Sequence, residues 1–232
     1  MGVDVGGTFT DLVATDAGGA IVRFKVATTP RAPEEGLLDA LRTLLRDGAL
    51  PLGQGADVVV VPTAAAFIGL TEAAILTSVP FDDFDVHVEA LMVSERAATA
   101  DPYFIERLAS ADVVVLCDGS PLHARSVWRA NAFGDAINAA PLLVAIGAVA
   151  SVLGDVMIDP RGGAPTTGLG YRIGAALCVP SSEDQMLRTR SLLGDVPLVA
   201  LGPTGVVCHD GERWSVVTGD VVVTRGHDVV EL

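Results

Sequence analysis

Three short loops of the sequence carry residue types that could bind an anion or take part in hydrolysis. In the first, DGSPLHARS, Ser120 precedes a proline as a helix cap does, so backbone N–H groups after Gly119 could bind an anion or stabilise an oxyanion. His123 and Arg125 follow in the first turns of the expected helix. A structural role is the alternative, with Ser120 as the cap and His123 as a surface or internally bonded residue.

The second loop, DPRGG, runs from Asp159 to Gly163. The adjacent Gly162 and Gly163 let the backbone approach a ligand or a neighbouring chain closely. Arg161 could bind a carboxylate through two hydrogen bonds, and that carboxylate could belong to a ligand or to Asp159. A rigid turn with an internal Asp–Arg pair is the simpler interpretation, and a ligand site is the alternative.

The third loop lies near the N-terminus, in GVDVGGTFTD. Asp4 could hold a metal ion or a water molecule, and Gly6, Gly7 and Thr8 offer backbone N–H groups to an anion. A β-hairpin with a purely structural role is the alternative.

The elements that position these loops alternate between strands and helices. Continuous apolar runs, typical of buried parallel strands, lie at 57–64, 86–93, 112–119 and 141–148. Helices are expected around 68–78, 101–110 and 121–139. This order predicts an α/β fold with a doubly wound, mainly parallel sheet, and the close-spaced strands after residue 174 predict an antiparallel edge hairpin. Residues 2–27 and 33–48 predict an N-terminal β-hairpin and a helix.

Ligands of such folds bind beyond the carboxyl ends of the strands. That rule selects the loops 62–67, 117–125, 147–151 and 180–184 as the places where a site is expected.

The composition limits the classes of partner. Half of the 232 residues are hydrophobic and 19% are charged, so a large buried core is expected. A formal net charge of −14 disfavours nucleic acid and anionic membranes. The three cysteines, Cys117, Cys178 and Cys208, are widely spaced among apolar neighbours, which indicates neither disulfides nor a zinc site. We expect a cytoplasmic protein without a signal peptide, a membrane span, a metal ion or a cofactor.

Four segments together resemble one enzyme family. VVVVPTAAAF, ALMVSERAATADP, DGSPLHARSVW and MIDPRGGAPTTGLG are similar, in order and spacing, to the peptidase S51 family. That family includes dipeptidase E and cyanophycinase and belongs to the class I glutamine amidotransferase-like superfamily. The resemblance covers about 57–232. It implies a flavodoxin-like fold, a nucleophilic serine in G-S-S-A-G-A on a strand-to-helix elbow, a histidine after a later strand, and an oxyanion hole from a glycine-rich loop.

The residues that would carry this chemistry are only partly present. Gly119 and Ser120 match the glycine-rich loop, although Asp118 stands at the family's first glycine. Ala148 stands at the position of the serine, and Ser181 at that of the histidine. Without a nucleophile the covalent step cannot occur there.

Other nucleophiles are less suited to this chemistry. Ser151 is the candidate substitute, three residues past Ala148, but no Gly-x-Ser-x-Gly surrounds it. Cys117 and Cys178 lie at expected strand ends among apolar neighbours, which is typical of buried core residues.

The first part of the chain resembles a second family. GVDVGGTFTDLVATD and KVATTPRAPEEGLLDALRTLL are similar to the N-terminus of the hydantoinase A/oxoprolinase family, over about 1–52. There the segment opens an actin-like ATPase fold, and the resemblance implies that Asp4, Gly6, Gly7 and Thr8 approach nucleotide phosphate. The predicted division is therefore a segment at 1–52 and a domain at 57–232. The segment could also replace the first β-unit of that domain.

Three functions follow from these observations. We favour a catalytically degenerate S51-like protein that binds a small molecule or peptide or serves structurally. The alternatives are an active serine hydrolase acting on small acidic or basic peptides, and a nucleotide-binding module. A homodimer is expected, with the Ala-rich surface at 132–140 as one possible contact.

Overall fold

The computed structural model describes part of the chain, and it divides the chain into two compact units. The structure describes residues 53–171, 174–178, 182–201, 206–209, 214–218, 221–226 and 228–229, and the strand backbones at 2–5, 9–15 and 21–27. One unit is Pro51–Val149, and the other combines Met1–Leu50 with Ala150–Leu232. Each unit is described by itself.

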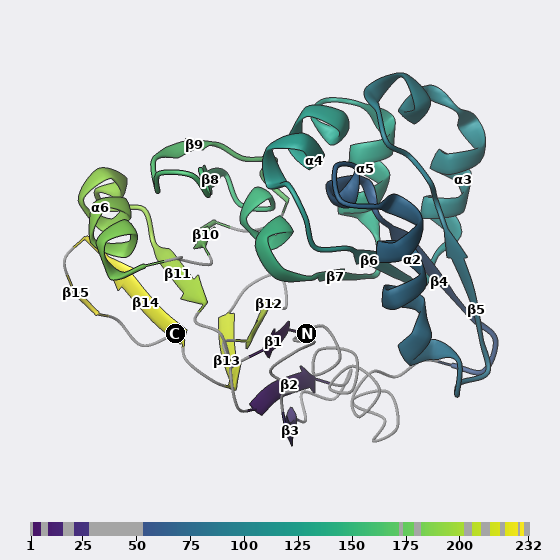
Figure 1. The fold of residues 1–232 in the computed structure, drawn as a ribbon, viewed down its shortest axis with the longest axis horizontal. Coiled ribbons are helices and arrows are strands. Elements are labelled where there is room, and N and C mark those ends of the chain that lie inside the picture. Colours follow the sequence, from purple (N-terminus) through teal and green to yellow (C-terminus); the bar gives the residue numbers. More distant parts are fainter. Residues whose placement is uncertain are drawn as a thin grey trace. The chain divides into compact units, whose positions relative to one another are not determined.

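The unit Pro51–Val149 is built around a parallel sheet of four strands, in the order β5-β4-β6-β7. The strands are β4 (Ala56–Val61), β5 (Val86–Ala90), β6 (Val113–Leu116) and β7 (Leu142–Ala145). Helices flank the sheet (Figure 1): α2 (Leu70–Ser78), α3 (Pro102–Ser110), α4 (Pro121–Trp128) and α5 (Ala132–Ala139). Short 3-10 turns lie at η1 (Thr63–Ala65), η2 (Val79–Phe81), η3 (Arg96–Ala100) and η4 (Gly147–Val152).

The two central strands explain why this sheet forms. Val58 to Val61 of β4 are fully buried, and Val113 to Leu116 of β6 are at most 2% exposed. A parallel strand covered on both faces must be apolar at every position, which is the pattern that the sequence shows. The predicted α/β fold with a mainly parallel sheet is therefore confirmed.

The predicted helical region 121–139 is two helices rather than one. Helix α4 ends at Trp128, and Ala130 takes a left-handed φ of 50°. The Asn131 side chain then accepts a hydrogen bond from the Gly134 N–H and caps α5. The larger apolar residues of α5, Phe133 and Ile137, are buried within this unit.

The second unit contains a mixed sheet in the order β15-β14-β11-β10-β8-β9. Its strands are β8 (Val156–Ile158), β9 (Pro165–Thr167), β10 (Ala176–Cys178), β11 (Leu198–Leu201), β14 (Val221–Arg225) and β15 (Asp228–Val229). Strands β8, β10 and β11 are parallel, and β14 and β15 form the predicted antiparallel hairpin at one edge. A separate hairpin joins β12 (Val206–His209) and β13 (Trp214–Thr218).

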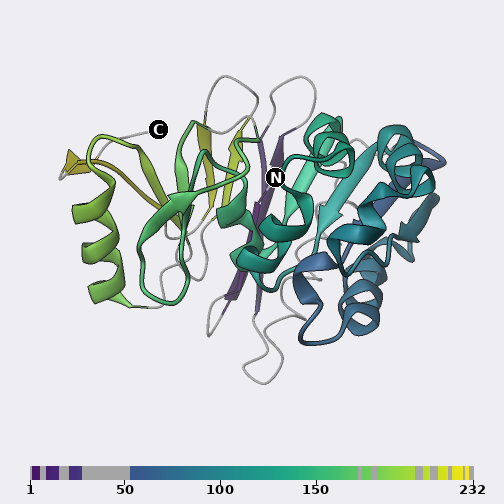
Figure 2. The same cartoon turned by 90° about the horizontal axis from the view of Figure 1, so that it is seen from above.

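Helix α6 (Glu183–Leu193) packs against this sheet (Figure 2) and was not predicted. Its last residue, Leu193, joins a core cluster with Ile158, Leu198 and their neighbours. The sequence does carry a signal for this helix, because Ser182 followed by Gln185 three residues later is a capping box. Ser182 Oγ accepts the Gln185 N–H at 3.2 Å.

The N-terminal strands form an antiparallel sheet of their own. Strands β1 (Gly2–Val5), β2 (Phe9–Thr15) and β3 (Ile21–Ala27) pair in that order, in agreement with the three short strands expected there. The helix expected at 33–48 lies outside the described residues. The division at 1–52 and 57–232, and the replacement of a first β-unit, stay predictions.

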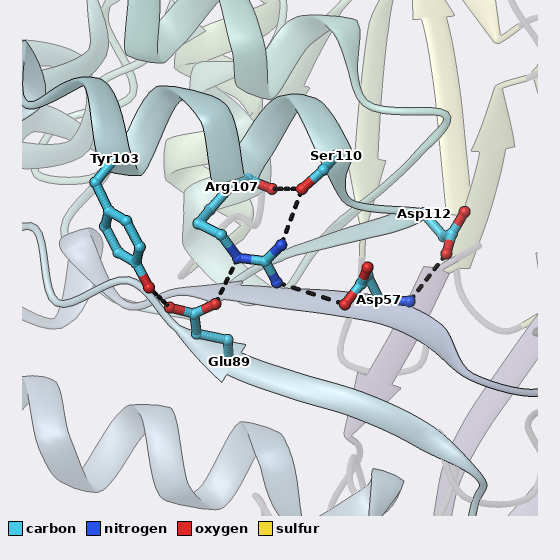
Figure 3. A network of polar contacts seen from close by, with 6 residues as sticks. All are labelled: Asp57, Glu89, Tyr103, Arg107, Ser110 and Asp112. Carbon is cyan, nitrogen blue, oxygen red and sulfur yellow. Dashed lines mark hydrogen bonds and ion pairs between the residues drawn. The ribbon is translucent and has the colours of Figure 1, made fainter.

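A polar network fixes α3 on the edge of the parallel sheet (Figure 3). Glu89 of β5 accepts hydrogen bonds from the Tyr103 hydroxyl and, at 2.6 Å, from Arg107 Nε. Arg107 also reaches Asp57 of β4 at 3.4 Å and the Ser110 hydroxyl at 2.9 Å. The hydrogen bonds from Tyr103 and then from Arg107 lower the pKa of Glu89, although desolvation opposes them.

We predict that Glu89→Gln destabilises the protein by less than about 1 kcal/mol at neutral pH, because the ion pair is partly exposed to solvent. A lowered folded-state pKa contributes stability above the unfolded pKa, and that contribution is lost as the pH falls through the folded value. The difference from wild type should therefore shrink at about pH 3. Urea unfolding at both pH values measures it, with Glu106→Gln on α3, next to Arg107, as the control. An equal or larger difference at acid pH would contradict the assignment.

Candidate functional site

The carboxyl ends of β4, β6 and β7 bring three predicted loops to one edge of the sheet. Backbone hydrogen bonds continue past the strands, from Cys117 N–H to Val61 O at 3.2 Å and from Ile146 N–H to Leu116 O at 3.1 Å. The loops 62–67 and 117–125 and the bend at 147–149 therefore lie together in one unit, as the rule for ligand sites predicts. The described part of the fourth loop, 182–184, belongs to the other unit.

Asp118 is the residue at which two of these loops meet. Its Oδ1 atom accepts a hydrogen bond from the Gly119 N–H at 2.7 Å and another from the Ala148 N–H at 2.8 Å. We call these two backbone donors the amide pair. Two backbone N–H groups that converge on one oxygen at 2.7–3.1 Å are the arrangement of an oxyanion hole. Here the oxygen belongs to the protein's own carboxylate.

Gly147 is the residue that turns the chain after β7. Its φ is +65°, in the left-handed region that glycine adopts without strain. A Cβ atom at this position would lie 2.4 Å from Asp118 Cγ and 2.5 Å from each carboxylate oxygen. The carboxylate of Asp118 therefore fills the space that a side chain at residue 147 would need.

The sequence predicts Ala148 at the position of the nucleophile. In the structure the left-handed residue of the bend is Gly147, and the N–H of Ala148 is one of the two donors. In a nucleophile elbow the N–H after the nucleophile is likewise a donor. Gly147, Ala148 and Val149 all lack a hydroxyl or thiol, so none of these three side chains offers a nucleophile at the bend.

Gly119 holds the second loop in place. Its φ is +149°, and a Cβ atom there would lie 2.2 Å from the Ala64 carbonyl oxygen, so only glycine fits. The next N–H, that of Ser120, donates to this same carbonyl at 2.7 Å, and Ser120 Oγ accepts the His123 N–H at 3.3 Å. The N–H groups of Gly119, Ser120 and His123 at this helix start are thus engaged within the protein, and Ser120 is a cap.

Burial disfavours the ionised form of the Asp118 carboxyl group. Part of the residue is open to solvent, but desolvation of its carboxyl raises the pKa more than the hydrogen bonds from Gly119 and Ala148 lower it. A raised folded-state pKa means that the ionised form costs folding free energy, and that stability falls as the pH rises from the unfolded to the folded pKa.

His123 and Arg125 lie on α4 beside this edge. The Nε2–H of His123 donates to the Ser94 carbonyl oxygen at 2.8 Å, and its ring packs edge-on against Phe67 at 4.7 Å between centroids. His123 is thus held by its own unit, as the structural interpretation predicted. Arg125 is half-buried, and within the described residues its Nε has no hydrogen-bond partner.

The DPRGG loop connects β8 and β9 in the other unit. Arg161 donates to both carboxylate oxygens of Asp159, from Nε at 3.0 Å and from Nη2 at 2.8 Å. Gly163, with φ +70°, lies against Thr189 of α6, whose hydroxyl donates to the Gly163 carbonyl at 2.9 Å. Gly162 has open space around its Cα. The structure therefore has the rigid turn with an internal ion pair.

The remaining candidates are buried or lie outside the described residues. Ser151 lies in η4 and is 5% exposed. Burial raises the pKa of Cys117 to about 11 and that of Cys178 to about 12, so both behave as core residues. The placements of Ser181, Gly6, Gly7 and Thr8 lie outside the described residues, as does the side chain of Asp4.

The described residues contain no group of three His, Cys, Asp or Glu side chains that could hold a metal ion. None of their helices has both the length and the apolar character that a membrane crossing requires.

The comparisons with known proteins support both resemblances seen in the sequence. In structure, the chain is similar to a peptidase from an acI-B1 actinobacterium, with a TM-score of 0.67 and 18% identity over 98% of this chain and 96% of that chain. It is also similar to a putative peptidase E protein from Listeria monocytogenes EGD-e, with a TM-score of 0.49 and 15% identity over 79% of this chain and 92% of that chain. The comparison with curated proteins found no match.

The chain has a peptidase fold. At 18% identity this structural similarity establishes the fold, and it does not establish an enzymatic activity for this chain. Residues 1–72 match the hydantoinase/oxoprolinase N-terminal region. That confirms the N-terminal resemblance and extends it past residue 52, through β4 and into α2.

We predict that Gly147→Ala and Asp118→Ala are energetically coupled. In wild type, Gly147→Ala places a methyl group against the carboxylate and adds left-handed strain of about 1–2 kcal/mol. In the Asp118→Ala background the strain remains, but the three atoms that the methyl group meets are gone. Gly147→Ala should therefore cost at least about 1 kcal/mol less in that background. Urea unfolding of the four proteins measures the coupling, and additive effects would show that the carboxylate does not fill this space.

Proposed function

We propose that this chain is a catalytically silent protein with a peptidase fold, which binds a small molecule or peptide or serves structurally. The observation that carries the proposal is the bend after β7, where Gly147 stands at the left-handed position and the Asp118 carboxylate lies against its Cα. A covalent hydrolase needs an attacking oxygen or sulfur at this point.

The amide pair supports the proposal independently of the nucleophile. Hydrolysis of an amide or ester develops negative charge on the substrate oxygen, and a hydrolase meets that charge with donors that are available to it. The Gly119 and Ala148 N–H groups already donate to Asp118, which carries its own negative charge when ionised. A substrate carbonyl would have to displace that carboxylate before it could be activated.

The main alternative is a serine hydrolase that uses Ser151. Ser151 as a residue is 5% exposed, and it follows Gly147 by four residues, inside η4. A nucleophile must reach solvent-borne substrate next to the oxyanion donors. The burial of Ser151 therefore favours the silent protein over this alternative.

The other sequence predictions stand as parts of the proposal. A homodimer is proposed without a located interface, because Phe133 and Ile137 of α5 are used within their own unit. The match of residues 1–72 keeps nucleotide binding through Asp4, Gly6, Gly7 and Thr8 as a separate prediction.

We predict that the protein neither reacts with a fluorophosphonate probe nor hydrolyses Asp- or Arg-containing dipeptides. Replacing Ala148 by serine should not create turnover, because the Asp118 carboxylate still occupies the amide pair. Probe labelling is read by intact-mass spectrometry and hydrolysis by release of the free amino acid. Ser151→Ala is the matched variant. Labelling of wild type that Ser151→Ala abolishes would replace our proposal with the hydrolase alternative.

A further inference from the structure

The contact between Asp118 and the amide pair has the form of a protein–ligand contact. One carboxylate oxygen receives both N–H groups, and the donors come from loops that follow two different strands, β6 and β7. Gly119 directly follows Asp118, so its half of the contact is local, whereas Ala148 is 30 residues away from Asp118 in the sequence. The Ala64 carbonyl helps to hold the Gly119 loop in place, because it receives the Ser120 N–H at 2.7 Å and leaves no room for a side chain at Gly119.

We infer that the amide pair is a carboxylate-binding site whose resident ligand is Asp118, and that a small external monocarboxylate binds the same two N–H groups when Asp118 is withdrawn. The site suits a carboxylate because two convergent N–H donors match one anionic oxygen. It suits a small one because Gly147 offers a surface without a side chain, which the Asp118 carboxyl group now covers.

The energetics of Asp118 are compatible with displacement. Desolvation raises the pKa of Asp118 in spite of the two hydrogen bonds, so the ionised carboxylate is less stable here than in water. Withdrawal of the side chain into solvent regains that hydration, while the amide pair is left for another anion. The inference goes beyond the proposed function, since a hydrolase with a nucleophile elsewhere would have the same occupied donors.

The test follows the backbone amide signals of Gly119 and Ala148 by ¹⁵N–¹H NMR while sodium acetate is added at constant ionic strength and neutral pH. In Asp118→Ala both signals should shift together and reach a plateau. In wild type they should remain unmoved. Acetamide, the neutral analogue of acetate, should leave both signals of Asp118→Ala in place. Absence of a shift in Asp118→Ala, or an equal shift in wild type, would overturn the inference.

Two further variants separate occupancy from charge. Asp118→Asn keeps an oxygen on the amide pair but removes the charge. The Gly119 and Ala148 signals of this variant should therefore not respond to acetate. A response like that of Asp118→Ala would mean that Asp118 excludes acetate by charge repulsion alone. Asp112→Ala is the matched control, because Asp112 also accepts a backbone N–H, that of Asp57 at 2.9 Å, away from the amide pair. An acetate response at Gly119 and Ala148 in Asp112→Ala would likewise contradict the inference.

One readout does not require Asp118→Ala to fold. Exchange of Asp118 for Asn turns two charge-assisted hydrogen bonds into neutral ones, so the Gly119 and Ala148 amide protons should both move upfield relative to wild type. Unchanged shifts at these two amides would show that neither donates to Asp118 in solution.

Discussion

The candidate site depends on one interaction, the acceptance of two backbone N–H groups by a single carboxylate oxygen of Asp118. Because this carboxylate also lies 2.4–2.5 Å from where a Cβ of residue 147 would be, it determines what the bend after β7 can hold. Glycine at 147 and aspartate at 118 therefore form a complementary pair: each position limits the size of the side chain at the other. A reacting group and a substrate oxyanion would compete with Asp118 for the same space and the same donors.

Sheet topology creates this juxtaposition. Strands β6 and β7 are parallel neighbours, with Leu116 opposite Ala145 in the register, so the residues that follow them leave the sheet side by side. The backbone hydrogen bond from Ile146 N–H to Leu116 O, at 3.1 Å, continues this pairing past the ends of the strands. The loop after β4 contributes the Ala64 carbonyl, which receives the Ser120 N–H and leaves no room for a side chain at Gly119. The loops after three parallel strands thus meet at this edge, and the donors of two of them share the Asp118 carboxylate.

The sequence predicts the framework of this site but not its central contact. The valine runs of β4 and β6 and the Ser120 cap follow from hydrophobic pattern and helix-capping chemistry, and each is found where expected. Helix α6 was not predicted, because its residues carry no clear apolar stripe. The capping pattern of Ser182 and Gln185 is the signal that could have indicated it. The similarity to the peptidase family predicts Ala148 at the nucleophile position and does not predict the left-handed conformation of the preceding Gly147. The contact of Asp118 with Ala148 requires the order and register of β6 and β7, which composition and periodicity do not specify.

The central claim is that Gly119 and Ala148 share one carboxylate acceptor. A pH titration of wild type, followed at these two amide protons, tests it most directly. We expect both resonances to move with one common midpoint, above the usual pKa of an aspartate, because the same desolvated carboxyl group gains its proton under each of them. Two different midpoints, or a titration at only one of the two amides, would contradict the account.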